Sequence, residues 1–249
     1  MQAIGMGEEA KQLKICNPNT MRLFLDVSSL VCPAEDYVLA IWGHGCGFDP
    51  KKDIPGKYEL LQPVNRGVMA DEWNDDEWMD MYEMGDALKA AGIDRLNTLY
   101  FHNCFMGNME TLTQARNFAD YIFASSHILS SDGLLLTEFV RGLMEKGNAV
   151  DAGTQMFERS WNSWHTDYVD AKDNLFWNGE FKMIRTDKFD AIIDASKRLA
   201  DRVIALYPTQ QEAIDRATRQ VYRYDPYKAQ YENPFFDLAD YAHQLANET

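Results

Sequence analysis

The stretch that decides the fold is YVLAIWGHGCG, residues 37–47. Its first six residues are apolar without alternation, which is typical of a strand buried on both faces of a parallel sheet. Its last five residues include three glycines, which indicate a loop whose backbone can approach a neighbouring segment closely. The stretch therefore predicts an α/β protein in which a buried strand ends at a glycine-rich loop carrying His44.

A second apolar segment, NTLYFHN at residues 97–103, reads as another strand, and Cys104 follows it directly. Residues 121–125 predict a third short strand. Apolar residues recur at helical spacing between and after these strands. They predict helices at residues 71–91, 109–118, 134–144 and 150–161. Alternation of strands and helices predicts a layered α/β architecture with a mostly parallel sheet flanked by helices.

The remaining segments extend the same pattern. Residues 21–31 suit either a short amphipathic helix or a strand, and residues 181–186 alternate as a strand does. Residues 188–207 carry the most regular apolar stripe, which we expect Pro208 to end, and residues 238–245 predict a last helix. The length suits a single domain over 1–249, with 187–249 as its helical C-terminal part.

Composition excludes several classes of protein. The 249 residues are 46% hydrophobic and 25% charged, as in ordinary globular proteins, so a disordered chain is excluded. With 24 basic and 39 acidic side chains the net charge is −15, which argues against nucleic acid and anionic lipid as partners. No apolar run reaches the roughly 18–20 residues that membrane insertion needs. The N-terminus lacks the basic and apolar regions of a signal peptide.

The two strand ends predict the chemistry. Sites in parallel sheets form at the carboxyl ends of strands, so His44 and Cys104 are expected on one rim. A thiol beside an imidazole can attack a carbonyl, and the backbone N–H groups of Gly45 and Cys104 can stabilise the resulting oxyanion. Alternatives from the same residues are a simple turn at His44, a buried structural Cys104, and a zinc site of His44, Cys46, His102 and Cys104.

Two blocks carry a resemblance to a known family. Residues 37–47 resemble the histidine block of the clostripain-like cysteine peptidases, and CFMGNME, residues 104–110, resembles their nucleophile block. Weaker matches follow, including Ala124-Ser125 and Asp132-Gly133, so that the resemblance spans roughly residues 17–245. It implies a caspase-like fold, a thiol protease acting on peptides or proteins, and a mechanism through a thioester. His44 would be the general base and acid and Cys104 the nucleophile.

The resemblance also implies a substrate site at His102, Ser125 and Asp132. The family usually has Asp where this chain has His102, and that Asp selects Arg or Lys at the P1 position of the substrate. Histidine removes the negative charge, so we expect a preference for an acidic or polar P1 residue.

Further expectations rest on the resemblance alone. No cofactor is needed for the chemistry, and calcium is possible. The family is largely bacterial and extracytoplasmic, which suggests secretion, whereas the sequence leaves the compartment and the oligomeric state open. Members usually carry a longer segment before the histidine strand, so we expect this chain to lack it. A catalytically inactive relative that binds peptides or proteins is the alternative.

Overall fold

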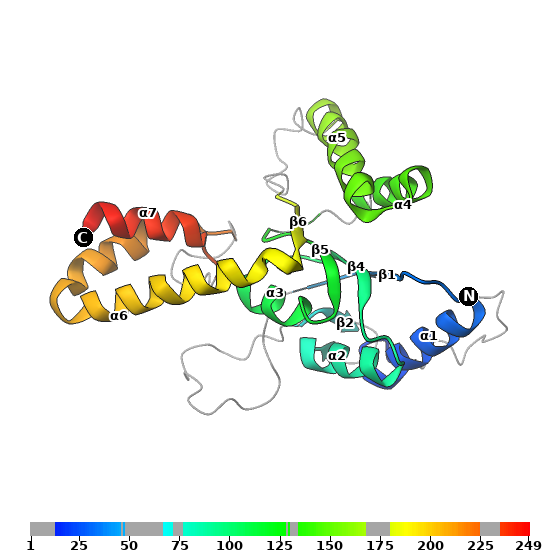
Figure 1. Cartoon of the computed structure of the whole chain (residues 1–249). Helices are drawn as coiled ribbons and strands as arrows, with labels where there is room; N and C mark the ends of the chain where they lie inside the picture. The colour runs from blue at the N-terminus through cyan, green and yellow to red at the C-terminus, as the bar shows by residue number, and fades with distance from the viewer. Residues whose placement is uncertain are drawn as a thin grey trace.

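A four-stranded sheet forms the centre of the computed structural model (Figure 1). Its order is β1 (Val38–Trp42), β4 (Leu96–His102), β5 (Ala119–Ala124) and β6 (Lys182–Arg185). The first three strands are parallel and β6 is antiparallel to β5. The predicted α/β class with a mostly parallel sheet is confirmed. The structure describes residues 13–45, 47, 67–71, 77–127, 129, 134–167, 180–224 and 235–249.

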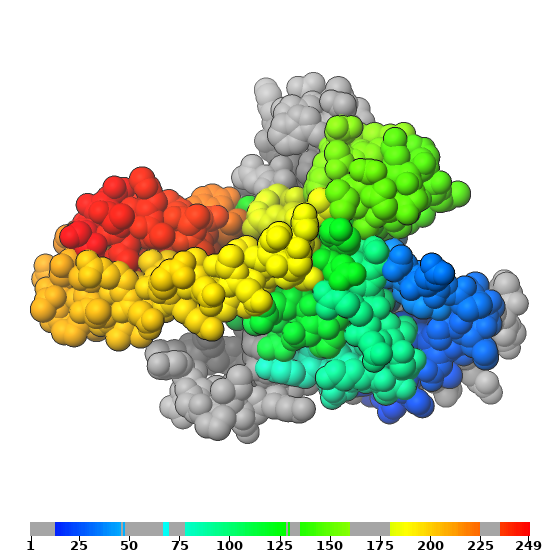
Figure 2. Space-filling view, viewed as in Figure 1, coloured from blue at the N-terminus to red at the C-terminus, as the bar shows by residue number. Residues whose placement is uncertain are grey.

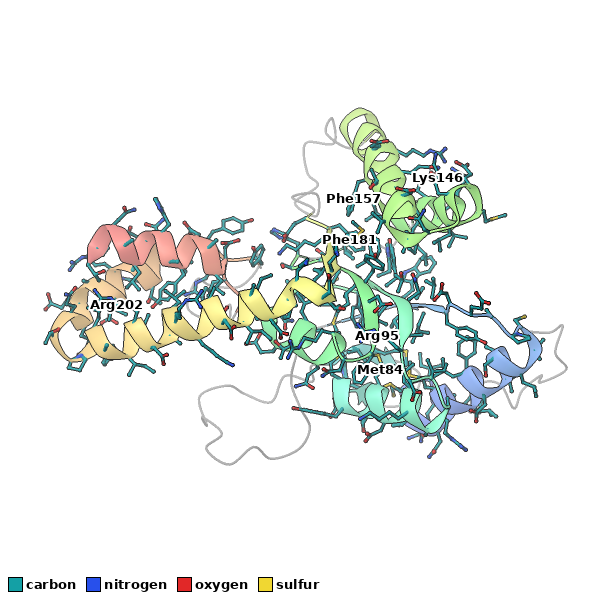
Figure 3. The ribbon with its side chains drawn as sticks, viewed as in Figure 1. Met84, Arg95, Lys146, Phe157, Phe181 and Arg202 are labelled. Carbon is teal, nitrogen blue, oxygen red and sulfur yellow. The ribbon has the colours of Figure 1, made fainter. Side chains whose placement is uncertain are left out.

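Helices cover both faces of the sheet. One face packs against α1 (Pro18–Val31), α2 (Met81–Ala90) and α3 (Met109–Ala115) through a core that includes Leu99 and Phe101. The other face packs against α4 (Leu134–Lys146) and α5 (Ala149–Asp167) through Tyr100 and Phe123. Phe157 of α5 and Phe181, next to β6, belong to this second cluster (Figure 3), with ring centroids 6.2 Å apart. The sequence left residues 21–31 open between helix and strand, and they are helical.

β1 differs from the predicted strand in its burial. Leu39 and Ile41 are buried, whereas Val38, Ala40 and Trp42 are exposed, so burial on both faces was wrong. The physical reason is position: within the described residues β1 lies at the edge of the sheet and pairs only with β4. The interior strand β4 is buried along almost its whole length, as predicted.

The helix predicted over residues 71–91 begins later than expected. Its first part contains a small antiparallel pair, β2 (Met69–Asp71) and β3 (Glu77–Met79), and α2 starts only at Met81. Asp80 caps that helix, since its Oδ1 accepts from Glu83 N at 2.8 Å while Glu83 Oε2 accepts from Asp80 N at 2.9 Å. This reciprocal capping box fixes the start of the helix.

The C-terminal part is a helical arm that projects from the sheet (Figures 1 and 2). After the short helix η4 (Thr186–Lys188), α6 runs over Phe189–Gln220, and α7 (Leu238–Glu248) packs along it. Pro208 does not end α6: the backbone bends two residues later, at Gln210 (φ −132°, ψ 31°). The arm has its own small core of Leu206, Ile214, Ala217 and Leu245. Whether the chain counts as one domain stays a prediction.

Arg95 joins the arm to the sheet. This side chain, labelled in Figure 3, donates to Ala119 O at 2.8 Å and to Thr186 Oγ1 at 2.9 Å. Thr186 Oγ1 in turn donates to Ala119 O at 2.8 Å. These bonds fix the start of α6 against β5. Among the described helices, none has the length and apolar character to cross a membrane.

Candidate active site

Pairing of β1 with β4 brings the two predicted catalytic loops to the same edge. Trp42 is the cross-strand partner of His102, and Gly43 N donates to His102 O at 3.5 Å. His44 and Cys104 each follow two residues after that pair. Both loops therefore leave the carboxyl edge of the sheet side by side, and the His44 side chain is exposed there.

Asn103 fastens the two loops together. Its side chain is fully buried, and Nδ2 donates to Gly43 O at 3.2 Å and to His44 O at 3.4 Å. Gly45 is in close contact with the same segment, because an added Cβ would lie 2.6 Å from Asn103 Cβ and 2.8 Å from Cys104 O. Only glycine permits this approach. The sequence predicted Gly45 but not Asn103, which has no periodic or motif signal.

The Cys104 thiol is partly buried against the chain that follows β5. Leu129 N donates to Cys104 Sγ at 3.3 Å, and Sγ lies 3.9 Å from Leu129 O. Burial raises the pKa of the Cys104 thiol above its ordinary value, and the backbone hydrogen bonds only partly offset this. The thiol is therefore protonated at neutral pH and needs a base to become nucleophilic.

The residue after Cys104 has an uncommon backbone conformation. Phe105 has φ +62°, the left-handed region that is unusual for an aromatic residue. Its N–H donates to His127 O at 3.0 Å, and its carbonyl accepts from Asn108 Nδ2 at 2.6 Å. Gly107 N then donates to Ser125 O at 2.7 Å. The loop after Cys104 is thus fixed against the end of β5.

The three predicted substrate-binding residues have different fates. His102 is only 3% exposed, with Trp42 edge-on at 5.5 Å and Tyr100 stacked at 6.4 Å. Ser125 is buried, and its Oγ accepts from His127 N at 2.9 Å and donates to His127 O at 3.2 Å. Asp132 lies outside the described residues. Trp42, 55% exposed beside His102, was not predicted as part of the site.

A polar and aromatic cluster that the sequence did not reveal lies next to the cysteine loop. Tyr222 Oη is 3.3 Å from His127 Nε2, and the ring of Tyr224 meets His127 edge-on at 4.9 Å. Lys182 Nζ donates to Ser126 Oγ at 2.9 Å. Burial lowers the pKa of His127, and the positive charge of Lys182 lowers it further, against the opposing effect of a backbone hydrogen bond with Tyr224. These residues come from three segments that are far apart in the sequence and meet only in the folded chain.

The alternative zinc site and a calcium site would each need a cluster of metal-ligating side chains. Over the described residues no group of three or more His, Cys, Asp or Glu side chains is arranged to hold a metal ion. Cys46, one of the four ligands of the alternative zinc site, falls outside the described residues, as does most of the acidic run at 71–77.

Comparisons with known proteins agree with this geometry. The model of the clostripain family matches residues 2–248. A secreted C11 cysteine protease from Bacteroides thetaiotaomicron, solved with an irreversible peptide inhibitor, is similar with a TM-score of 0.66 and 18% identity, covering 92% of this chain and 57% of that one. Iotapain, a secreted C11 cysteine protease from the same organism, gives a TM-score of 0.65 at 18% identity, with 92% and 58% covered.

A third solved structure is an inactive zymogen C11 protease from Parabacteroides distasonis. It is similar with a TM-score of 0.60 and 16% identity, covering 93% of this chain and 57% of that one. This chain therefore spans a little over half the length of the solved structures it matches. No curated protein sequence matches it. The likeness confirms the predicted caspase-like fold, with its central sheet between helices.

Proposed function

Because the chain belongs to the clostripain family of cysteine peptidases, we propose that it is a cysteine endopeptidase that works through a dyad of Cys104 and His44. The observation that carries the proposal is the contact between the two loops. Asn103 bonds to the carbonyls of Gly43 and His44 while its neighbour in the chain is Cys104. A thiol and an imidazole at adjacent strand ends are what nucleophilic attack on an amide needs.

The proposed mechanism follows from the protonated thiol. His44 takes the proton of Cys104 Sγ as the sulfur attacks the peptide carbonyl, and the C=O electrons move onto the oxygen. The N–H groups of Gly45 and Cys104 would donate to that oxyanion. The C–N bond then breaks, His44 protonates the leaving amine, and a thioester remains. Water, deprotonated by His44, hydrolyses the thioester and regenerates the thiol.

For specificity we propose an acidic or polar P1 residue. His102 is buried two residues before Cys104, on the strand face that it shares with Trp42 and next to β5, the strand that Ser125 follows. An imidazole offers a hydrogen bond or a positive charge and does not pair with a basic side chain. Cleavage that is best after Arg or Lys would contradict this part of the proposal.

A peptide-binding relative without activity is the second candidate. It is favoured by the raised pKa of the Cys104 thiol, and one of the similar solved structures is an inactive zymogen. Such a protein would bind a peptide at the same edge without hydrolysing it.

One experiment separates the two. A peptide library with every P1 residue is incubated with the wild type, Cys104→Ala and Cys32→Ala, each with chelator and with added calcium. Cys32 is exposed and lies outside the site, so Cys32→Ala is the matched thiol control. A peptidase cleaves in the wild type and the control but not in Cys104→Ala. Binding without cleavage in all three proteins would favour the inactive relative, and loss with chelator alone would establish a calcium requirement.

We also propose that the protein acts outside the cytoplasm. Support comes from the relatives described as secreted and from the absence of a membrane-spanning helix among the described helices. Fractionation of the producing cells with an antibody against this chain tests the proposal, and a signal confined to the cytoplasm would contradict it.

A further inference from the structure

A short hairpin returns the end of the chain to the catalytic edge. Residues 222–224 pair with 235–237 through a bridge between Arg223 and Phe236. Tyr224 N donates to Phe235 O at 3.1 Å, and Asp237 N donates to Tyr222 O at 2.9 Å. We call these two segments the clasp. It lies between α6 and α7 in the chain, yet Tyr222 and Phe235 contact residues more than 90 positions earlier.

Phe235 of the clasp contacts both catalytic loops. Its ring stacks on Phe105, the residue after Cys104, with centroids 5.3 Å apart and planes 9° from parallel. The same ring also lies against Gly47, where an added Cβ would be 2.5 Å from Phe235 Cζ. The same Cβ would lie 2.9 Å from Asn108 Nδ2, whose amide bonds to Phe105 O. One ring thus packs between the loop that follows His44 and the loop that follows Cys104.

The clasp is anchored to the turn that also holds the cysteine loop. Tyr222 and Tyr224 pack on His127, whose backbone carbonyl accepts the N–H of Phe105. Tyr224 Oη donates to Asp237 Oδ2 at 2.5 Å, and Lys182 lies over the Tyr224 ring at 5.5 Å. The position of Phe235 is therefore fixed from the sheet side and does not depend on the catalytic loops alone.

Phe105 supplies the reason why such a contact matters. An aromatic residue at φ +62° is held in a sparsely populated region, and such a conformation persists only when its surroundings impose it. A relaxed Phe105 would rotate the peptide that joins it to Cys104. The stacked ring, the bond to His127 and the bond from Asn108 are the contacts that oppose this rotation.

We propose that Phe235 is a positioning residue for the dyad: its ring holds Phe105 in the left-handed conformation and sets the spacing between the His44 and Cys104 loops. The C-terminal arm thereby completes the active site. The inference rests on the proposed peptidase function, and its test has one readout that does not require activity.

The first readout is the kinetics of Phe235→Ala with Phe236→Ala as the matched control. Phe236 belongs to the same clasp, but its ring packs on Tyr241 at 5.5 Å and on Arg223 at 5.8 Å. For Phe235→Ala we expect kcat to fall about 10- to 100-fold with KM within about threefold, because a small displacement of the nucleophile has costs of that order. The kcat of Phe235→Leu should lie between the kcat of Phe235→Ala and that of Phe236→Ala. Equal kcat values for the two alanine variants would overturn the inference.

The second readout is alkylation of the cysteines by iodoacetamide, followed by mass spectrometry. Cys104 should react faster in Phe235→Ala than in the wild type or Phe236→Ala, because the loop that buries its thiol is released. Exposed Cys32 is the reference for the reagent, and buried Cys16 reports global unfolding. Faster reaction of Cys104 with Cys16 still protected supports the inference even if no peptide is cleaved, in which case the proposed function alone fails. An unchanged alkylation rate at Cys104 overturns the inference, and so does alkylation of Cys16 to the same extent as Cys104.

Discussion

The two catalytic loops of this protein are built differently. The cysteine loop leaves the interior strand β4, and backbone hydrogen bonds to His127 and Ser125 hold it against β5. The histidine loop leaves the edge strand β1, where Asn103 of the cysteine loop donates to the carbonyls of Gly43 and His44 and where Phe235 lies against Gly47. The loop of the proposed nucleophile is thus bonded to the end of the neighbouring strand, whereas the histidine loop is joined to the cysteine loop through Asn103. Substitutions should therefore act differently on the two sides.

The largest effects are expected at the reactive groups themselves. Cys104→Ala should abolish hydrolysis, because it removes the sulfur that forms the proposed thioester. His44→Ala should lower kcat by about 10²- to 10⁴-fold, the range that general acid and base catalysis supplies. Since His44 is exposed, the melting temperature should hardly change. Active-site titration and thermal unfolding check both, and full activity of His44→Ala would remove the histidine from the mechanism.

Substitutions at two glycines, one in each loop, test whether the two loops differ in rigidity. An added Cβ at Gly107 would lie 2.8 Å from backbone atoms of Ser125 and Ser126, which cannot move without disturbing β5. Gly107→Ala should therefore lower the free energy of unfolding by about 1–3 kcal/mol. Gly45→Ala meets equally close atoms, but its loop leaves an edge strand and can shift.

For Gly45→Ala we therefore expect a loss of kcat/KM of about 100-fold with a smaller change in stability. Urea unfolding and steady-state kinetics on both variants measure the difference. A Gly45→Ala protein as destabilised as Gly107→Ala would show that the two loops are equally rigid and would remove the contrast.

Asn103 gives an intermediate effect that tests the link between the loops. Asn103→Ala loses two hydrogen bonds to the carbonyls of Gly43 and His44, worth about 1–2 kcal/mol in stability. We expect kcat to fall about tenfold, because the histidine loop loses its partner. Asn97→Ala, at the other end of β4, is the control and should leave kcat unchanged. Identical kcat values for the two variants would show that Asn103 serves the fold alone.

The smallest effect concerns pH. Burial raises the pKa of Cys104 in the folded state, so the folded protein keeps that proton more tightly than the unfolded chain. The stability due to this group is complete below the thiol pKa of the unfolded chain, about 8.5, and is lost as pH rises through the higher folded pKa. The wild type should therefore lose stability relative to Cys104→Ala as the pH rises above about 8.5. Chemical unfolding of both proteins at these pH values checks this, and parallel curves would contradict it.

Local sequence patterns predicted the strands that carry the site, because apolar runs followed by glycine or cysteine are local signals. They did not predict that Val38 and Trp42 are exposed, since that depends on which strands flank β1. The helix predicted at residues 71–79 was wrong for a related reason. An antiparallel pair of short strands and a helix bury similar apolar residues over so short a length. The sequence predicted that the helix ends at Pro208, whereas the kink in α6 falls two residues later, at Gln210.

The candidate site divides in the same way. His44, Gly45 and Cys104 stand next to strand ends, where chemistry is expected from the order of residues alone. Asn103, His127 and Phe235 contribute through contacts that only the folded chain creates, and Phe235 stacks on a residue 130 positions earlier. Such contacts leave no periodicity or motif. The position of this candidate pair at the strand ends was therefore predictable, and the residues that contact its loops were not; the catalytic roles of His44 and Cys104 stay a prediction.

The outer edge of β1 has a consequence for control of the proposed dyad. Among the described strands, β1 has a partner on one side only, and a strand edge of this kind is a template for a further extended segment. A strand added there would bury Val38 and Trp42 and stiffen the peptide that leads into His44. A pro-segment or an inhibitor that binds by strand addition would thus act on the acid–base group without touching the sulfur.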